Sequence, residues 1–398
     1  MPVNYRSFRT GVPWLLLCLQ ALLIVFFYFF FSGDDGSHIQ SYPAFQDVNH
    51  MVVFGFGFFL LFLRRYGFSS TAFNLLMVAL GVQCSALLEA NLGLLLQRQK
   101  ESHLQRIKKA AVSVTAVIIS TGAVLGKANP VQLILMTIVE IIGFHVSRCL
   151  NMYFLQVSEE VSMMHVLLFG AYFGLAFSSR FSEPSPRSEK NRSTPKSDLL
   201  SMLGTLFLWV FWPSFSVVVG GQLRVTAIYN TYFALAVSAV TAFLLSALTT
   251  RDGKFRMTHI HSSVLAGGIA VGYSALSIDS PWIAMILGLL ASVISVLGSH
   301  CLQRCLYPLL RFHDAAGVHF TFGLPAVLGA VAEVILLLIK NWTHLPSLGD
   351  LVLVHVGAVS LTISVALLLG FVTGFILNLR LFKTIPASKY FEDQCYWE

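Results

Sequence analysis

The sequence has little charge. Asp, Glu, Lys and Arg make up 11% of its 398 residues, whereas 56% are hydrophobic and the mean hydropathy is +0.74. A soluble domain carries charged residues at about 25% of its positions. This chain cannot cover its surface in that way, so a soluble globular protein is excluded and a membrane protein is indicated.

The sequence also lacks the patterns of most enzyme and metal sites. Its six cysteines form no Cys-x-x-Cys pair, so neither a disulfide framework nor a zinc site is indicated. No glycine-rich segment is followed by Lys-Ser or Lys-Thr, and no nucleophile, base and orienting group fall together in a loop. No basic stripe with interleaved aromatic residues lies outside the apolar segments. We therefore expect no enzyme activity, no cofactor, no metal and no nucleic-acid partner.

What the sequence does contain is twelve apolar segments of about 20 residues, the length that crosses a bilayer as a helix. We therefore expect an all-α integral membrane protein. The first segment exceeds the apolar core of a signal peptide, so we interpret it as a retained helix. The expected spans are 11–31, 45–63, 70–90, 110–125, 130–150, 163–179, 199–218, 226–248, 261–277, 282–299, 316–339 and 350–379.

Lys and Arg are distributed unevenly between the two sides of these spans. With twelve spans both termini lie on one side, which carries 18 of the 26 basic residues, so we expect both termini to be cytoplasmic. We expect one membrane domain over 1–398, with a polar linker at 180–198 between two halves and a cytoplasmic tail at 380–398. An odd number of spans in each half predicts an inverted repeat of five plus five helices with extra flanking helices.

Several ionisable residues fall inside the expected spans, where each needs a partner, a cavity or a neutral form. Glu140 is the most central of them, and it is either a gate carboxylate or a hydrogen-bonded carboxyl that ties helices together. A histidine can relay protons along a pore, although a lone histidine on a helix is more often structural. These residues are Glu89, Glu140, Glu333, His165, His261, His319 and His355.

Long motifs are spread over nearly the whole chain. They are 45–48 (Phe-Gln-Asp-Val), 54–58, 64–70 (Arg-Arg-Tyr-Gly-Phe-Ser-Ser), 122–127 (Gly-Ala-Val-Leu-Gly-Lys), 170–175 (Gly-Ala-Tyr-Phe-Gly-Leu), 206–214, 265–272, 317–319 and 389–394 (Lys-Tyr-Phe-Glu-Asp-Gln). These motifs resemble the ammonium transporter and Rhesus (Rh) superfamily, and specifically its Rh branch. The resemblance implies a plasma-membrane trimer of helical subunits, each with a pore between its inverted halves.

Transporting members of that superfamily carry two pore histidines, and the resemblance gives their positions here. The first falls three residues before the Gly-Ala-Tyr-Phe-Gly motif, at Leu167. His165 lies two positions away, about 200° around a helix, so it cannot stand in for the first histidine. Phe322 occupies the place of the second, whereas His319 matches a non-pore histidine of the same motif. The resemblance therefore implies an apolar plug with no hydrogen-bond relay.

The resemblance assigns further residues to the pore or its vestibule. Thr121 replaces one phenylalanine of an outer gate and Phe215 keeps the other. Glu159 stands at the place of an acidic residue at the outer end of the sixth span, and His165 and His319 are vestibule candidates.

The loss of both histidines is similar to the Rh blood-group polypeptides of the D and CE type. That similarity implies a structural or accessory subunit in the erythrocyte membrane. Its implied partners are a Rh-associated glycoprotein or other Rh subunits in a trimer, and a cytoskeletal adaptor such as ankyrin. The alternative is a working conduit for ammonia, ammonium or carbon dioxide, because a neutral gas needs no relay.

Two kinds of modification are indicated. Asn341 opens an Asn-Trp-Thr glycosylation sequon on the expected outer side, although such sequons are often unused. Cys301 and Cys305 flank a cytoplasmic helix end, where they are either palmitoylated or inert thiols.

Overall fold

The fold is known from a computed structural model. It describes residues 6–30, 42–95, 102–182, 192–219, 225–250, 252–275, 277–302, 314–341, 345–382 and 384–397. Residues 183–191 of the expected linker at 180–198 therefore lie outside the described residues.

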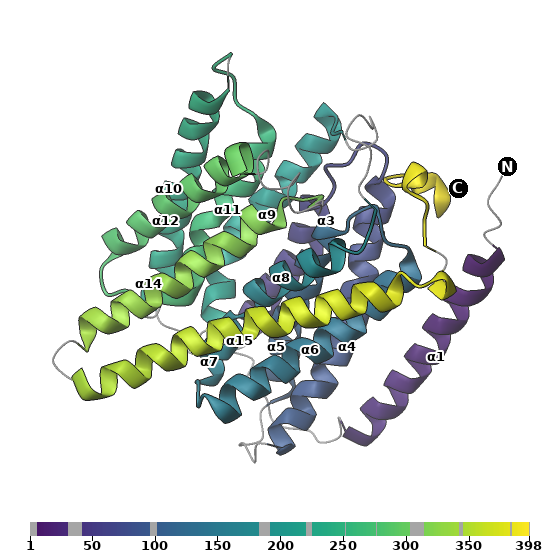
Figure 1. The fold of residues 1–398 in the computed structure, drawn as a ribbon, viewed down its shortest axis with the longest axis horizontal. Coiled ribbons are helices and arrows are strands. Elements are labelled where there is room, and N and C mark those ends of the chain that lie inside the picture. Colours follow the sequence, from purple (N-terminus) through teal and green to yellow (C-terminus); the bar gives the residue numbers. More distant parts are fainter. Residues whose placement is uncertain are drawn as a thin grey trace.

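The described residues form helices and no strand (Figure 1). The longer helices are α1 (Arg6–Phe30), α2 (Tyr42–His50), α4 (Gly67–Leu95), α5 (His103–Ala123), α6 (Pro130–Phe154), α8 (Val166–Ser178), α9 (Pro195–Val219), α10 (Val225–Thr249), α11 (Met257–Ser274), α12 (Pro281–Leu297), α14 (Leu324–Lys340) and α15 (Leu345–Leu377). The shorter turns are η2 (Met51–Gly55), α3 (Phe56–Phe59), α7 (Glu159–Met164), η4 (Gly298–Leu302), η5 (His319–Gly323), η6 (Arg380–Phe382), η7 (Ala387–Lys389) and η8 (Asp393–Cys395).

All twelve expected spans are helical, and nine of the described helical segments are long and apolar enough to cross a membrane. The other three are 42–59, α5 and α11. The first is divided into short turns, α5 begins with three basic residues, and α11 carries two histidines near its start. Helices α5 and α11 lie inside the bundle, where neighbouring helices surround most of their length, whereas 42–59 is partly exposed, with Phe54 46% exposed.

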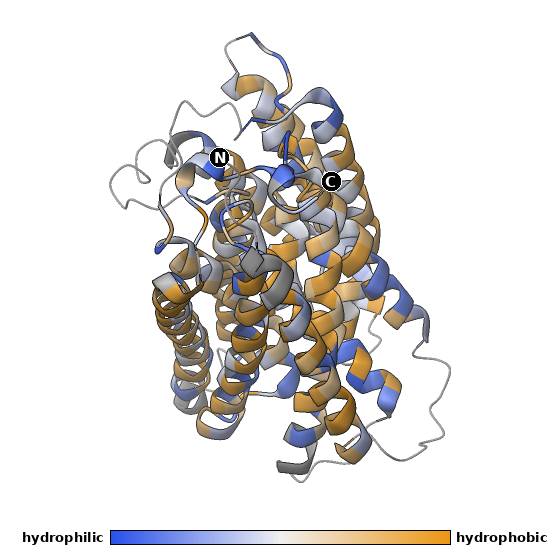
Figure 2. Cartoon of the chain, turned by 90° about the vertical axis from the view of Figure 1, so that its right-hand side faces the viewer, coloured by the Kyte–Doolittle hydropathy of each residue, from blue (hydrophilic) through white to orange (hydrophobic). Residues whose placement is uncertain are grey.

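Both termini lie toward one end of the bundle, which we call the terminal face (Figure 2). Backbone hydrogen bonds join the loops of this face: Arg64 N donates to Arg192 O over 3.1 Å, and Ala315 N donates to Ala123 O over 3.4 Å. The opposite end, which we call the far face, carries the turns at 155–158 and 277–280. Hydrophobic residues cover most of the helix surface between the two faces (Figure 2).

The two halves of the chain repeat the same helix contacts in opposite orientation. In the first half α4 packs against α5 and α6, and α5 packs against α8. In the second half α10 packs against α11 and α12, and α11 packs against α14. Because α4 runs away from the terminal face and α10 runs toward it, the repeat is inverted, as expected.

Glycines let the central helices approach closely, because a lipid solvent gives no hydrophobic driving force between helices. A Cβ added at Gly170 of α8 would lie 2.5 Å from Ala116 O of α5, and one added at Gly329 of α14 would lie 2.1 Å from Ala270 O of α11. These contacts are at equivalent places in the two halves, so backbone touches backbone on both sides of the centre.

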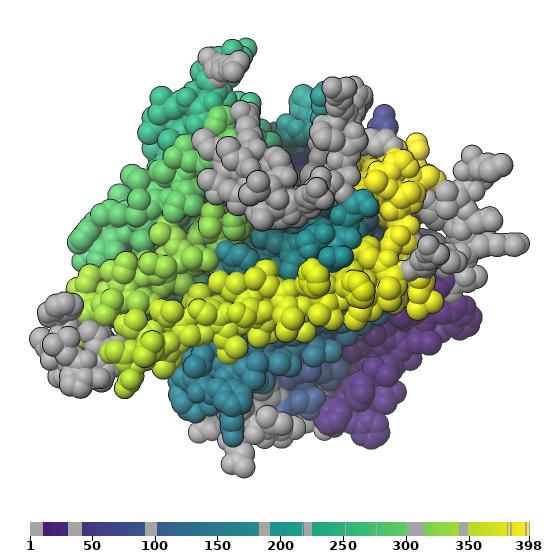
Figure 3. Space-filling view, in the orientation of Figure 1, coloured from purple at the N-terminus to yellow at the C-terminus, as the bar shows by residue number. Residues whose placement is uncertain are grey.

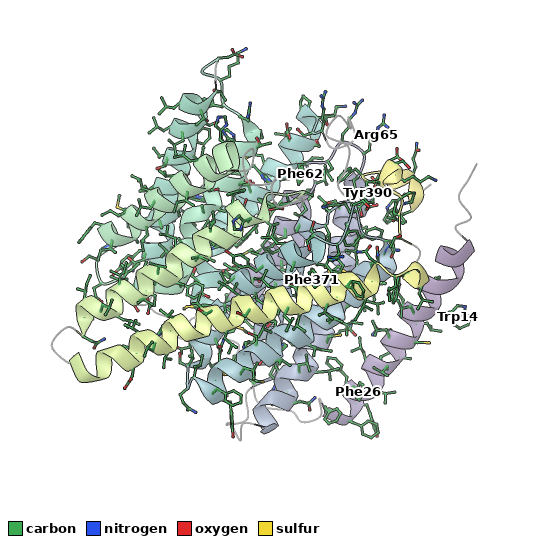
Figure 4. All side chains as sticks on the ribbon, in the orientation of Figure 1. Trp14, Phe26, Phe62, Arg65, Phe371 and Tyr390 are labelled. Carbon is green, nitrogen blue, oxygen red and sulfur yellow. The ribbon has the colours of Figure 1, made fainter. Side chains whose placement is uncertain are left out.

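Helices α1 and α15 lie at the periphery. In Figure 3, α15 runs across the whole face that is drawn, and Phe371 on its outer side is 47% exposed. Trp14 and Phe26 point away from the bundle along α1 (Figure 4). Among the described residues an amide pair joins α1 to α4: Gln20 Nε2 donates to Gln83 Oε1 over 2.8 Å, and Gln83 Nε2 lies 3.3 Å from Gln20 Oε1. These outer faces have the composition of lipid-facing surfaces.

The C-terminal segment is bound to the terminal face. Asp393 accepts hydrogen bonds of 2.9 Å from the backbone N–H groups of Phe68 and Ser69, in the first turn of α4. Phe391 N donates to Gly126 O over 3.0 Å. Burial raises the pKa of the Tyr390 phenol, and hydrogen bonding with Ser182 lowers it in part. The motif at 389–394 is therefore a docking element that caps a membrane helix.

Candidate functional site

Two interrupted helices meet in the centre of the molecule, one from each half. The first breaks at His165, between α7 and α8, and carries Leu167 in the first turn after the break. The second begins with the wide turn η5, which ends with Phe322 and Gly323 before α14. Helix α8 packs against η5, and a Cβ added at Gly323 would lie 3.5 Å from Ala171 Cβ. The positions of both expected pore histidines therefore lie at the junction of the halves.

Leu167 adjoins a very small cavity on the far side of this junction. The cavity has a volume of about 10 Å³, which is room for about one water molecule. Trp212 and Phe215 form one wall, with ring centroids 5.6 Å apart. The described lining residues are Met164, Leu167, Trp212, Phe215, Ser216, Ile269, Gly272 and Tyr273. The structure thus brings Phe215 and Leu167 to the lining of one cavity, and their role in a pore stays a prediction.

Phe322 belongs to a cluster of aromatic rings on the other side of the junction. Its ring centroid lies 5.9 Å from that of Phe56 and 6.0 Å from that of Phe59. Phe59 in turn stacks on the imidazole of His261, with centroids 4.0 Å apart and an interplanar angle of 15°. Phe56, Phe59 and Phe322 are each at most 2% exposed, so the cluster is closed to solvent.

A much larger cavity opens from this cluster toward the terminal face, and we call it the terminal vestibule. Its volume is about 420 Å³. The lining residues are Phe62, Asp198, Ser201, Arg256, Met257, Thr258, His259, His261, Ser262, Ser299, His300, Ala315, Ala316 and Gly317. Phe62 marks its level in Figure 4, at the same end of the molecule as Arg65 and Tyr390. Accessible space therefore falls from about 420 Å³ to about 10 Å³ across the centre of the molecule.

His165 and His319 do not line either cavity. His165 Nδ1 lies 2.7 Å from Thr362 Oγ1 of α15, and its ring stacks on Tyr273 with centroids 5.3 Å apart. Tyr273 therefore separates His165 from the small cavity. The His319 ring packs edge-on to Tyr172 at 5.9 Å. His165 is 1% exposed, whereas His319 is only partly buried, and a vestibule role for either stays a prediction.

Thr121 lies apart from Phe215. Its hydroxyl donates to Val117 O over 2.8 Å, and it lines a separate cavity of about 10 Å³ with Tyr66 and Gly126, close to the terminal face. The structure therefore does not place Thr121 opposite Phe215. The ring beside Phe215 in the small cavity is that of Trp212.

Glu159 lies in a charged network at the far face. Its Oε1 accepts hydrogen bonds from Lys109 Nζ over 2.7 Å and from Arg148 Nη2 over 3.3 Å. Arg148 also donates to Glu89, and His145 Nδ1 lies 3.7 Å from the same carboxylate. The two carboxylates, Glu89 and Glu159, are matched by the two cations, Lys109 and Arg148. The charge of Glu159 is therefore neutralised by side chains of the protein. Arg148, the central member, was missed by the sequence analysis because its partners are on other helices.

Glu140 ties three helices together. Ser120 Oγ of α5 lies 2.5 Å from Glu140 Oε1 of α6 and 2.7 Å from Gly170 O of α8. A hydroxyl has one proton, so when Ser120 donates to the carbonyl, the carboxyl group must donate to Ser120. This geometry fits a neutral, protonated Glu140 and the helix-tying interpretation rather than a gate.

The modification candidates lie at helix ends. Asn341 follows α14 at the far face, and its Nδ2 donates to Leu337 O over 3.0 Å. Cys301 is in η4 at the terminal face. The Cys301 side chain and Cys305 lie outside the described residues, so palmitoylation stays a prediction.

Comparisons with known proteins agree with this architecture. The protein family described as the Ammonium Transporter Family matches residues 14–391. The chain is 41% identical over 403 residues to the "RH-like protein" of Macaca mulatta, and the alignment covers 99% of this chain and 97% of the relative. It is 40% identical over 415 residues to the "Blood group Rh(D) polypeptide" of Rattus norvegicus, with the same coverage of each chain. A solved structure described as "Nitrosomonas europaea Rh50 and mechanism of conduction by Rhesus protein family of channels" is similar, with a TM-score of 0.77, 28% identity and coverage of 90% of this chain and 92% of that one.

Proposed function

The chain belongs to the ammonium transporter family, within its Rh branch, and we propose that it is a structural or accessory Rh subunit whose own pore is closed. The observation that carries this proposal is the narrowing between the terminal vestibule and the small cavity beside Leu167.

The chemistry of the narrow region supports closure. The side chains of Leu167 and Phe322 offer neither a donor nor an acceptor, and both are at most 3% exposed. An ammonium ion that leaves the vestibule loses its water shell there, and no imidazole at these two positions replaces it. A desolvated charge in a low-dielectric region costs several kcal/mol. The ion therefore stays on the vestibule side.

The aromatic cluster supports a rigid closure. The Phe322 ring contacts Phe56 and Phe59, and Phe59 is fixed by its stack on His261. His261 Nε2 lies 3.0 Å from Phe59 O and 2.6 Å from Ser201 Oγ. A displacement of Phe322 would disturb each of these contacts, so we expect the closed arrangement to persist.

Assembly and location are part of the proposal. We expect the chain to form a trimer with a Rh-associated glycoprotein or other Rh subunits in the plasma membrane. The excess of Lys and Arg on the terminal face supports cytoplasmic termini. A cytoskeletal adaptor such as ankyrin would then meet the docked C-terminal segment from the cytoplasm.

A second candidate function is a conduit for ammonia, ammonium or carbon dioxide. The full-length similarity to a Rh50 structure whose description refers to conduction favours it. A neutral gas needs no histidine relay, so closure to ammonium and passage of a gas are separate questions.

Flux into liposomes tests both candidates. We expect vesicles containing this chain alone to take up methylammonium at the rate of empty vesicles, and the double variant Leu167→His/Phe322→His to raise uptake. Phe320→His is a matched control, because Phe320 lies in the same turn but packs against Gly298 instead of the aromatic cluster. Uptake by the unchanged chain would refute closure. Carbon dioxide entry above that of empty vesicles would establish the gas conduit.

A further inference from the structure

Arg180 lies just after α8 at the terminal face, and its side chain follows the surface of α15 toward the middle of the membrane. Its backbone carbonyl accepts a hydrogen bond of 3.2 Å from Asn378 Nδ2, just beyond the end of α15. About one turn deeper, a Cβ added at Gly374 would lie 2.8 Å from Arg180 Cγ, so this glycine leaves room for the stem of the arginine. About one turn deeper again, the guanidinium carbon lies 4.8 Å from the centroid of the Phe371 ring.

This position is near the level where the hydrocarbon of a bilayer meets its headgroups. Helix α15 has 33 residues and is about 50 Å long at about 1.5 Å per residue. The hydrocarbon core is about 30 Å thick, so a helix centred in it extends about 10 Å beyond the core at each end. Phe371 lies about 9 Å before the helix end at Leu377. The guanidinium of Arg180 is therefore at the depth of lipid phosphates.

The surface around Phe371 faces lipid. Its side chain is 47% exposed on α15, the helix that crosses the front of the bundle in Figure 4. One turn deeper, Leu367 and Leu368 are 41% and 65% exposed. Arg180 is also exposed. An exposed cation thus lies above an exposed apolar strip, which is the order of groups that matches a phospholipid, whose phosphate lies directly above its acyl chains.

The helices that hold Arg180 supply no acid to balance its charge. Residues 161–182, which include α8, and residues 351–391, which include most of α15, contain no Asp and no Glu. Arg180 forms no salt bridge with any residue that the structure describes. The next acid along the chain, Glu183, lies outside the described residues. A cation at this depth is costly without an anion, and long basic side chains near helix ends usually extend toward water instead.

We propose that Arg180 and Phe371 form a binding site for the phosphate group of an anionic phospholipid in the leaflet of the terminal face. The Phe371 ring lies against the guanidinium, and the N–H groups at the edge of the guanidinium can donate to two oxygens of one phosphate. Leu367 and Leu368 contact the acyl chains. Anionic lipids are concentrated in the cytoplasmic leaflet, on the side where we expect the terminal face. The site is on the outer surface of the bundle, so it does not depend on the state of the pore.

Competition between two lipids for the full-length chain tests the proposal. Native mass spectrometry in detergent micelles that contain equal amounts of phosphatidylserine and phosphatidylcholine should show that the unchanged chain retains phosphatidylserine in preference. Arg180→Gln should reduce this retention about tenfold or more, because charge-assisted hydrogen bonds are lost. Arg180→Lys keeps the charge but not the planar fork, so it should cause a smaller loss. Phe371→Leu keeps an apolar surface without the ring and should also weaken retention.

Two variants serve as matched controls. Arg65→Gln removes an exposed arginine of the same face, which lies 4.0 Å from Glu392 instead of beside an exposed ring of α15. Phe26→Leu removes an exposed phenylalanine of α1 that has no cation over its ring among the described residues. Both variants should keep the preference for phosphatidylserine.

Three results would contradict the proposal. The first is equal retention of the two lipids by the unchanged chain, or an unchanged preference in Arg180→Gln. The second is a preference that appears only in Glu183→Gln, which would show that Arg180 is already paired within the chain. The third is a change of oligomeric state in Arg180→Gln without a change in lipid preference, which would assign this surface to a contact between subunits. None of these results depends on flux, so failure here is distinguishable from failure of the closed-pore proposal.

Discussion

The substitution Asp393→Ala tests whether the C-terminal segment stabilises the membrane domain. Asp393 is separated from α4 by more than 320 positions in sequence, yet it accepts two backbone hydrogen bonds of 2.9 Å from the first turn of that helix. Trp397 Nε1 donates to Ser69 Oγ over 2.9 Å, and Asp393 N donates to Arg65 O over 2.8 Å. The side chain thus serves as the cap of α4 and as the anchor of the tail.

The expected loss can be worked from these contacts. Replacement of a capping Asp by Ala costs typically about 1 kcal/mol for one capped N–H. Here two N–H groups are left without a partner and a favourable charge at the helix start is removed, so we expect a loss of about 2 kcal/mol. Asp393→Asn keeps an acceptor and should lose about half as much. Glu392 is the control, because it lies in the same segment but its salt bridge, 4.0 Å from the exposed Arg65 side chain, is long, and Glu392→Ala should cost less than about 1 kcal/mol.

Hydrogen exchange measures this loss at the capped residues. A cost of about 2 kcal/mol corresponds to about thirtyfold faster exchange of the Phe68 and Ser69 amides. Unfolding in mixed detergent micelles should shift to lower denaturant, and the fluorescence of Trp397 should report release of the tail. If Asp393→Ala exchanged these amides no faster than Glu392→Ala did, the capping argument would be wrong.

Two further predictions concern the bundle interior. Gly170→Ala should destabilise the protein by about 1–3 kcal/mol, because the new methyl group would lie 2.5 Å from Ala116 O. A methyl group added by Gly272→Ala would have no atom within 4 Å, so that variant should be neutral or stabilising. Thermal unfolding midpoints compare the two variants, and equal midpoints would contradict the prediction. Arg148→Met should lower the free energy of unfolding by about 3–5 kcal/mol, because it leaves the Glu89 carboxylate buried without its partner. Glu89→Gln in the same chain should recover most of that loss. A double-mutant cycle from unfolding curves measures the coupling, and additive effects would show that the pair is not coupled.

Local sequence information was sufficient for the spans. The segment expected at 130–150 is a helix from Pro130 to Phe154, which begins with a capping box between Asn129 and Gln132. Apolar length and a start signal are both encoded within that segment, so the prediction and the structure agree to a few residues. The break at His165 and the wide turn at η5 were not predicted. No glycine or proline lies between residues 159 and 169 to mark the first, and although Gly323 and Pro325 lie at the end of the second, they do not by themselves specify a wide turn.

The site shows the same division. The motif spacing placed Leu167 and Phe322, and the structure puts both at the junction of the halves. Their role as a closure stays a prediction. The Arg148 network could not be read from the sequence, since its members come from four separate helical segments that meet only after folding. Thr121 illustrates the limit of motif transfer, because a match in sequence fixes the helix but not the cavity that a side chain reaches.

The amide pair between Gln20 and Gln83 has a consequence for the order of biosynthesis. The ribosome delivers Gln20 to the membrane long before its partner, and until α4 arrives the glutamine side chain stands in lipid without a companion. Helix α1 therefore enters the membrane first, but its Gln20 side chain forms a hydrogen bond with Gln83 only after α4 has been inserted. A nascent chain that stops before residue 83 would lack this hydrogen bond between α1 and α4.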